Sequence, residues 1–295
     1  TLLFVITLVA IEKNSRKKQQ HFDSRGGKAS IKEPANKRKT VFIWAICGLI
    51  ISLGFIFPLL TLIQYCLDYW HENMNDIVLA HSQSTFILAT LAAGITTLLA
   101  ILFNSQQRFT PSKPNEAKLS LSSLGYAIPG TVLAIGILIP LGQLDSWSNQ
   151  LIQYLGFEKV GLIFSGTAFA LLLAFIIRFA AIGNGSIQAA YKRMPSNLDD
   201  ASTLLKASKF KTFTHIHLPI MRPAIISAFL LVFIECVKEL PASLLLRPFD
   251  FETLATYVYQ FATDEQLEHA ASSALLIILV SLIPILLLSR SQKMH

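Results

Sequence analysis

Residues 188–219 read QAAYKRMPSNLDDASTLLKASKFKTFTHIHLP and form the longest polar insertion in the last two thirds of a very apolar chain. The stretch contains the start and stop signals of a short helix. Ser196 can cap the helix, and Asp199 and Asp200 fall in its first turn, where the helix dipole favours carboxylates. We expect this first helix to end near Lys206.

A second helix is expected over residues 209–217, capped by Ser208 and stopped by Pro219, which cannot continue the hydrogen-bond ladder. One face of it carries three apolar side chains: Phe210, Phe213 and Ile216. Two helices this short cannot bury their apolar faces alone. They would either dock on a soluble partner or lie on lipid headgroups, and the residues themselves leave both interpretations open.

The composition around this stretch indicates a membrane protein. Hydrophobic residues make up 53% of the 295 residues and charged residues only 15%, against about 25% charged in ordinary globular domains. We predict an all-α membrane protein with one domain over residues 41–290. Its six predicted spans cover residues 41–65, 84–103, 119–141, 161–181, 222–237 and 270–288. The apolar run 1–11 is too short to span a bilayer, so we interpret it as the end of a truncated helix, followed by a basic linker over residues 12–40.

The distribution of Lys and Arg sets the expected orientation. With the basic linker on the cytoplasmic side, all but three of the 25 Lys and Arg residues lie inside; the exceptions are Lys159, Lys238 and Arg247. Residues 188–219 and the C-terminus are then cytoplasmic. The net charge of +7 is explained by this topology, so we expect no nucleic-acid partner.

The third predicted span contains the sequence from Gly125 to Gly130, with Tyr126 and Pro129 inside it. Pro129 frees a backbone carbonyl, and Gly130 lets a neighbour approach closely. In lipid both are tolerated only where protein or a cavity satisfies the backbone. We therefore expect this part of the span to face other helices or a pore.

Charged residues near the ends of the spans offer further candidates. Glu235, Lys238 and Glu239 would share one helix face, either as a polar gate or as a mutually neutralising cluster at the membrane interface. Arg178, near the end of the fourth span, is expected to reach toward the headgroups. His215 and His217, two apart in a helix, are interpreted as surface residues.

The sequence contains no motif that indicates an enzyme. The Gly-x4-Gly-Lys-Ser/Thr phosphate loop does not occur, so any ATP would be bound by another chain. The sequence offers no set of ligands with the spacing of a metal site. We expect a protein without catalytic residues, metal or cofactor of its own.

Within the opening stretch, one spacing resembles a known family. Asp200-Ala201-Ser202, three residues, Lys206, nine residues and then Ile216 to Pro219 is similar to the cytoplasmic loop of ABC importer permeases. Their pattern is Glu-Ala-Ala, three residues, Gly, nine residues and Ile-x-Leu-Pro. Lys206 departs from this pattern, since it stands where the family has glycine. A left-handed turn at that position would cost a residue with a side chain roughly 1 kcal/mol.

Residues 125–134, 178–179 and 238–256 further resemble ferric-iron importer permeases, in which two six-helix halves are fused in one chain. The resemblance covers residues 41–288 and implies the second half, with the type I importer fold. It implies import of a solute, ferric iron before thiamine, polyamines or sulfate, across a bacterial inner membrane. A secondary transporter without an ATPase, and a receptor or assembly factor, are the competing hypotheses.

The implied partners are a cytoplasmic ATPase dimer, a periplasmic solute-binding protein, the second permease half and the lipid membrane. The resemblance implies that the loop grips the ATPase through the following residues: Asp199, Asp200, Ala201, Ser202, Leu205, Lys206, Ala207, Ser208, Phe210, Phe213, Ile216, Leu218 and Pro219. The candidates for a pore or gate are Tyr126, Pro129, Gly130, Glu235, Lys238 and Glu239.

Overall fold

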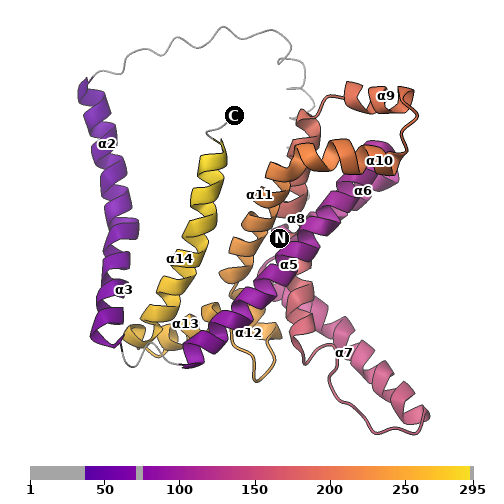
Figure 1. The fold of residues 1–295 in the computed structure, drawn as a ribbon. Coiled ribbons are helices and arrows are strands. Elements are labelled where there is room, and N and C mark those ends of the chain that lie inside the picture. Colours follow the sequence, from indigo (N-terminus) through magenta and orange to yellow (C-terminus); the bar gives the residue numbers. More distant parts are fainter. Residues whose placement is uncertain (1–36, 71–75, 293–295) are drawn as a thin grey trace. The chain divides into compact units, whose positions relative to one another are not determined.

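The computed structural model describes residues 37–70 and 76–292, and every regular element in this part of the chain is a helix (Figure 1). The truncated helix and most of the linker expected over residues 1–40 lie outside the described residues. The chain divides into two compact units, residues 1–61 and 62–295. The described part of the first contains α2 (Lys37–Ile51), the π-helical turn η1 (Ser52–Ile56) and the start of α3 (Phe57–Asp68).

The second unit contains the remaining helices. In chain order these are α5 (Asp76–Phe109), α6 (Lys113–Ser122), η2 (Leu124–Ala127), α7 (Gly130–Tyr154), α8 (Ala168–Arg193), α9 (Asn197–Leu204), α10 (Lys209–Thr212), η3 (Phe213–His217), α11 (Leu218–Val237), α12 (Pro241–Leu246), α13 (Leu254–Thr263) and α14 (Leu267–Gln292). Six helical runs in the described residues are long and apolar enough to cross a membrane, which confirms the predicted fold class.

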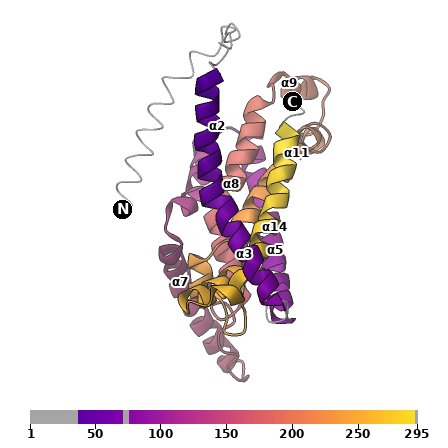
Figure 2. The same cartoon turned by 90° about the vertical axis from the view of Figure 1, so that its left-hand side faces the viewer.

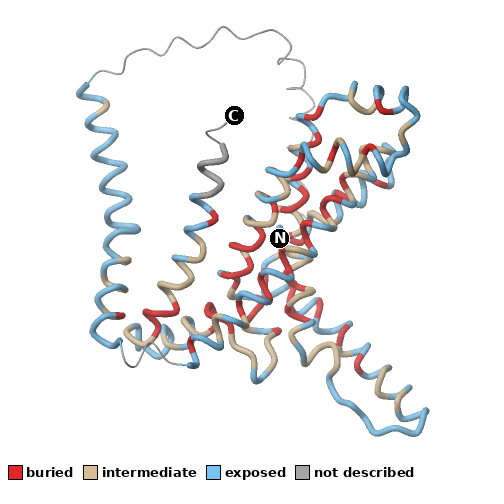
Figure 3. Tube along the Cα trace, viewed as in Figure 1, coloured by how far each residue is buried: buried red, intermediate tan, exposed pale blue. Residues whose placement is uncertain are grey.

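Helices α5, α8 and α11 pack against one another and form the core of the second unit, and α14 lies against α11 and α5 (Figure 2). Small residues line the contacts: Ala92, Ala93, Ala170, Ala174 and Ala228 are fully buried. In lipid, where helices gain little from the hydrophobic effect, small side chains favour association because they let backbones approach closely. Buried residues accordingly concentrate along these helices (Figure 3).

The third predicted span, 119–141, is not one helix. Helix α6 ends at Ser122, the short 3₁₀ turn η2 follows, and α7 begins only at Gly130. Pro129 explains the break, because a residue before proline is pushed out of the helical region, and Ile128 is extended (φ −87°, ψ 132°). The helix that follows continues to Tyr154, beyond the predicted end of the span at residue 141.

Buried polar side chains hold the end of α6 against its neighbours. The amide of Asn184 on α8 donates to the hydroxyl of Ser122 at 2.8 Å and accepts from the amide of Asn104 on α5 at 3.3 Å. Buried polar groups in a membrane protein need such partners. Gly125 completes the packing, because a Cβ there would clash with the Ile177 backbone, with the carbonyl carbon only 2.8 Å away.

The start of the fifth span differs from the prediction. Pro219 does not stop the preceding helix, because Lys209–Val237 is one continuous helical run. The π-helical turn η3 accommodates the proline. The N–H of Leu218 reaches back to the carbonyl of Phe213, so the regular ladder is already interrupted where Pro219 lacks a donor.

Replacing Gly125 with alanine should therefore destabilise the second unit, by about 1–3 kcal/mol or more, because a buried methyl group has no room against the Ile177 backbone. Thermal unfolding and size-exclusion chromatography of the detergent-extracted protein measure the effect. Gly136→Ala is the matched control, since nothing lies within 4 Å of a Cβ at that position. Equal behaviour of the two variants would contradict the packing described here.

Candidate docking site

The polar stretch forms two short helices, as expected, with a cap on the second. Helix α9 begins at Asn197, with Asp199 and Asp200 in its first turn. The side chain of Ser196 makes no capping hydrogen bond. The predicted cap at Ser208 is confirmed, because its hydroxyl accepts the N–H of Lys211 at 3.2 Å.

Lys206 occupies the turn between the two helices in a left-handed conformation, with φ 56°. The N–H of Lys206 bonds the carbonyl of Thr203 at 2.9 Å, and the N–H of Ala207 bonds that of Ser202 at 3.0 Å. This pair of bonds is the Schellman motif, which usually has glycine at the left-handed position. Lys206, which departs from the glycine of the family pattern, thus adopts the left-handed conformation despite its side chain.

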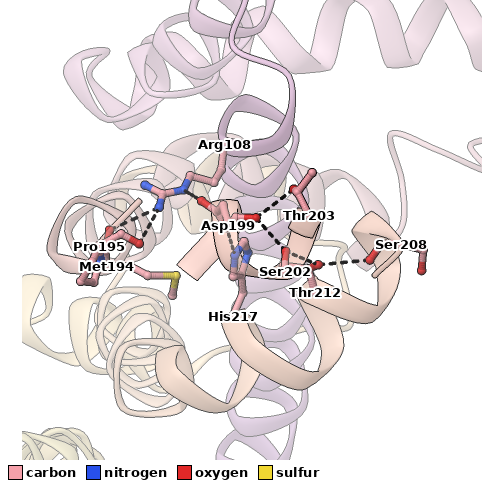
Figure 4. Close-up of polar contacts among 9 residues, drawn as sticks. All are labelled: Arg108, Met194, Pro195, Asp199, Ser202, Thr203, Ser208, Thr212 and His217. Carbon is pink, nitrogen blue, oxygen red and sulfur yellow. Dashed lines mark hydrogen bonds and ion pairs between the residues drawn. The ribbon is translucent and has the colours of Figure 1, made fainter. Parts of the chain in front are cut away.

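The carboxylate of Asp199 connects the end of α5 to the π-helical turn η3. It accepts a hydrogen bond from Nε of Arg108, at the end of α5, at 2.7 Å, and its other oxygen lies 2.7 Å from Nε2 of His217 in η3. Figure 4 shows Asp199 between these two side chains. Arg108 also donates to the carbonyls of Met194 and Pro195, which lead into α9.

His217 is fully buried, so its predicted surface position is wrong. Its ring stacks on Phe109 with centroids 4.9 Å apart and meets the edge of Tyr191 at 5.5 Å. Nδ1 is buried without a hydrogen-bond partner in the described part of the chain. Because a carboxylate oxygen accepts hydrogen bonds, Nε2 is the donor to Asp199. His215 is exposed, as expected.

Two further contacts join the loop helices to each other and to the spans. The hydroxyl of Thr212 on α10 donates to that of Ser202 on α9 at 3.0 Å. Phe213 and Leu198 pack on a buried cluster formed by α5, α8 and α11, so Phe213 is not available as an outward anchor. Ile216 and Leu218 are likewise half-buried. The loop therefore rests on the spans as a packed structure.

The outward side of the loop carries exposed apolar side chains. Leu204, Leu205 and Phe210 are 84%, 83% and 76% exposed. Lys206 and Lys211 are exposed beside them. We call these five residues the docking face. Large apolar residues exposed together in this way mark an interaction surface. Leu204 was not among the predicted site residues, although its apolar spacing in the sequence could have identified it.

The other predicted loop residues divide between the two sides. Asp200, Ala201, Ser208 and Pro219 are exposed, Ala207 is half-buried, and Ser202 is buried between the helices.

The candidate gate residues do not share a face. Helix α11 ends at Val237, and beyond it the chain turns Glu239 into the protein while Lys238 stays outside. Lys238 pairs with Glu235 at 2.8 Å. Glu239 instead pairs with Nε of Arg178 at 3.1 Å, and its other oxygen accepts the N–H of Ala242 at 3.3 Å. Arg178 is therefore held by an internal partner and does not reach toward the headgroups.

Gly130 makes room for this ion pair, as expected from its sequence context. A Cβ there would lie 2.9 Å from Oε1 of Glu239 and 3.2 Å from Nη1 of Arg178. The same Nη1 donates to the carbonyl of Ile128 at 2.9 Å, the residue before Pro129. Tyr126 and Pro129 are exposed beside it. The ion pair thus lies at the break in the third predicted span and satisfies a backbone carbonyl there.

No group of three or more His, Cys, Asp or Glu residues within the described ranges could hold a metal ion.

The chain is similar in sequence to several known transport permeases, among them the following three. It is 31% identical over 156 residues to the ferric transport system permease protein FbpB of Actinobacillus pleuropneumoniae, covering 52% of this chain and 22% of that protein. It is 28% identical over 222 residues to the Fe(3+)-transport system permease protein FbpB 2 of Haemophilus influenzae, covering 74% and 40%. A probable sulfate transport system permease protein cysT of Chlorella vulgaris is 23% identical over 235 residues, covering 76% and 85%. The chain thus spans at most two fifths of the length of the two ferric relatives.

The fold is similar to a chain in the crystal structure of a bacterial alginate ABC transporter in complex with an alginate pentasaccharide-bound periplasmic protein. The TM-score is 0.64 at 16% identity, over 85% of this chain and 92% of that one. This likeness confirms the predicted fold of a type I importer permease. The family model described as binding-protein-dependent transport system inner membrane component matches residues 96–295, more than half of the chain. The protein therefore belongs to this family of importer permeases.

Proposed function

We propose that the chain is the C-terminal permease half of an ABC importer that moves a solute from the periplasm to the cytoplasm. It carries no catalytic residue, and a separate ATPase dimer supplies the energy. A periplasmic binding protein delivers the solute to the end opposite the docking face. Ferric iron is the solute best supported, because two of the relatives are ferric permeases. Sulfate is the second candidate, because the sulfate relative matches over 85% of its own length.

The docking face is the surface that we assign to the ATPase. Leu204, Leu205 and Phe210 would enter an apolar groove, and Lys206 and Lys211 would meet acidic groups at its rim. Lying on lipid headgroups is the alternative, but three features favour a protein partner. The loop is packed on the spans, its turn is closed by the two Schellman hydrogen bonds, and Leu204, Leu205 and Phe210 remain exposed although Leu198 and Phe213 are packed.

One observation supports this proposal above the others, namely that the loop and the fifth span form one continuous helical run, Lys209–Val237. A pull on α10 then acts on α11 without an intervening flexible joint. Asp199 adds a second connection, because it ties α9 to the end of α5 through Arg108. Movement of the docking face would thus reach two of the three core helices.

Phe210→Ala should weaken binding of the ATPase by on the order of 2 kcal/mol, or about 30-fold in dissociation constant, because it removes a central apolar anchor. The measurement is the amount of ATPase subunit that co-purifies with the complete transporter, together with binding-protein-stimulated ATP hydrolysis. Phe249→Ala is the control, since Phe249 is also exposed but lies in the α12–α13 loop, at the other end of the second unit. Undiminished ATPase binding by Phe210→Ala would contradict the assignment.

Lys206→Gly should stabilise the loop by about 1 kcal/mol, because glycine adopts the left-handed turn without steric cost. Hydrogen exchange of the amides of residues 197–212 measures the change. Lys206→Ala removes the charge but keeps the strained turn, so it should leave the exchange rates near those of the natural protein. A similar gain in both variants would mean that the charge, and not the turn, controls the stability of the loop.

A further inference from the structure

The ion pair of Arg178 and Glu239 lies within the hydrocarbon layer, and one nitrogen atom of the arginine has no hydrogen-bond partner among the described residues. We propose that Arg178 lines the solute path and binds anionic oxygen atoms of the passing solute, so that the solute crosses as an anion or as an anionic complex. This inference rests on the proposed transport function and adds the chemical class of the solute.

The depth follows from helix geometry. Arg178 lies about 22 Å along α8 from its end at Arg193, and about 15 Å from its start at Ala168, at roughly 1.5 Å per residue. A hydrocarbon layer is about 30 Å thick, so the guanidinium lies inside it. Charged side chains at such depth are costly, and they face a protein interior or a water-filled path.

The hydrogen bonds of Arg178 show which part is uncommitted. Nε pairs with Glu239 and Nη1 donates to the carbonyl of Ile128. Nη2 has no hydrogen-bond partner among the described residues, and it is not shielded from solvent as a buried orphan would be. The side chain of Arg178 is 17% exposed and that of Glu239 only 8%. The cation is therefore the more accessible member of the pair.

The surface beside Arg178 is unsuited to lipid. Residues 124–129 are a 3₁₀ turn and an extended segment, and Leu124, Tyr126, Ala127 and Pro129 are exposed there. Irregular backbone in the hydrocarbon layer is tolerated only where it is buried in protein or lines an aqueous cavity. The close contact of Gly125 with the Ile177 backbone keeps this segment next to Arg178. Of these two environments, protein and an aqueous cavity, the cavity would provide water molecules as hydrogen-bond partners for Nη2.

The chemistry of a guanidinium identifies the solute class. Its planar N–H groups match the oxygen atoms of carboxylate, phosphate and sulfate, and they repel a bare cation. Sulfate fits this site directly. Ferric iron fits it when the ion carries anionic oxygen ligands, so an iron transporter of this kind would move a chelate.

The test uses the full-length, cysteine-free transporter assembled with its ATPase and binding protein in proteoliposomes. Tyr126→Cys places a single thiol on the exposed segment, where Tyr126 is 50% exposed. The thiol is then treated with two water-soluble reagents of similar size, the anionic sulfonatoethyl methanethiosulfonate and the cationic trimethylammonioethyl methanethiosulfonate. We expect both to react, and the anionic reagent to react about fivefold faster.

Two variants assign that preference to Arg178. Arg178→Lys keeps the charge and should keep the preference, whereas Arg178→Gln combined with Glu239→Gln removes the pair and should abolish it. Equal rates of the two reagents with Arg178 present would overturn the inference. So would labelling by a membrane-permeant maleimide alone, since the segment would then face lipid or the second permease half. ATP-driven uptake in the same vesicles tests the proposed function separately.

Discussion

The carboxylate of Asp199 is the contact on which the arrangement of the cytoplasmic loop depends. It joins three parts of the chain: the end of α5 through Arg108, the start of α9 in which it lies, and the π-helical turn η3 through His217. A buried imidazole and a guanidinium share one carboxylate, so removal of the carboxylate would leave the buried Nε2 of His217 without a partner. Because of this bridge, the docking face is attached to the core helices at its back and presents apolar side chains at its front.

The local features of the loop could be predicted from sequence because they depend on neighbouring residues. The Ser208 cap follows from one hydroxyl and the next turn of backbone. The glycine position of related loops marked residue 206 as the turn, although the conformation of Lys206 itself was not predicted; the Schellman bonds there are also local. Gly130, likewise, was expected to admit a close neighbour, although the identity of that neighbour was not predictable.

The unexpected features involve partners far apart in the chain. His217 is buried because its ring is hydrogen-bonded to Asp199 and stacks on Phe109. Helical periodicity cannot reveal either contact. Glu239 was grouped with Glu235 and Lys238 by spacing alone. It turns instead toward Arg178, which lies 61 residues earlier, once α11 ends at Val237. Pro219 was expected to break a helix, and a single π-helical turn, whose cost depends on the surrounding packing, allows the helix to continue.

In the proposed mechanism, the continuous helical run Lys209–Val237 and the Asp199 bridge both transmit movement from the docking face to the spans. The most direct measurement is the number of solute molecules taken up per ATP hydrolysed by the complete transporter in proteoliposomes when Asp199 is replaced by alanine. We expect the variant still to bind its ATPase and hydrolyse ATP, because the Schellman turn at Lys206 and the Thr212–Ser202 hydrogen bond hold the two loop helices together without Asp199, but the uptake per ATP should fall severalfold. An Asp199→Ala transporter with the normal ratio of uptake to hydrolysis would contradict it.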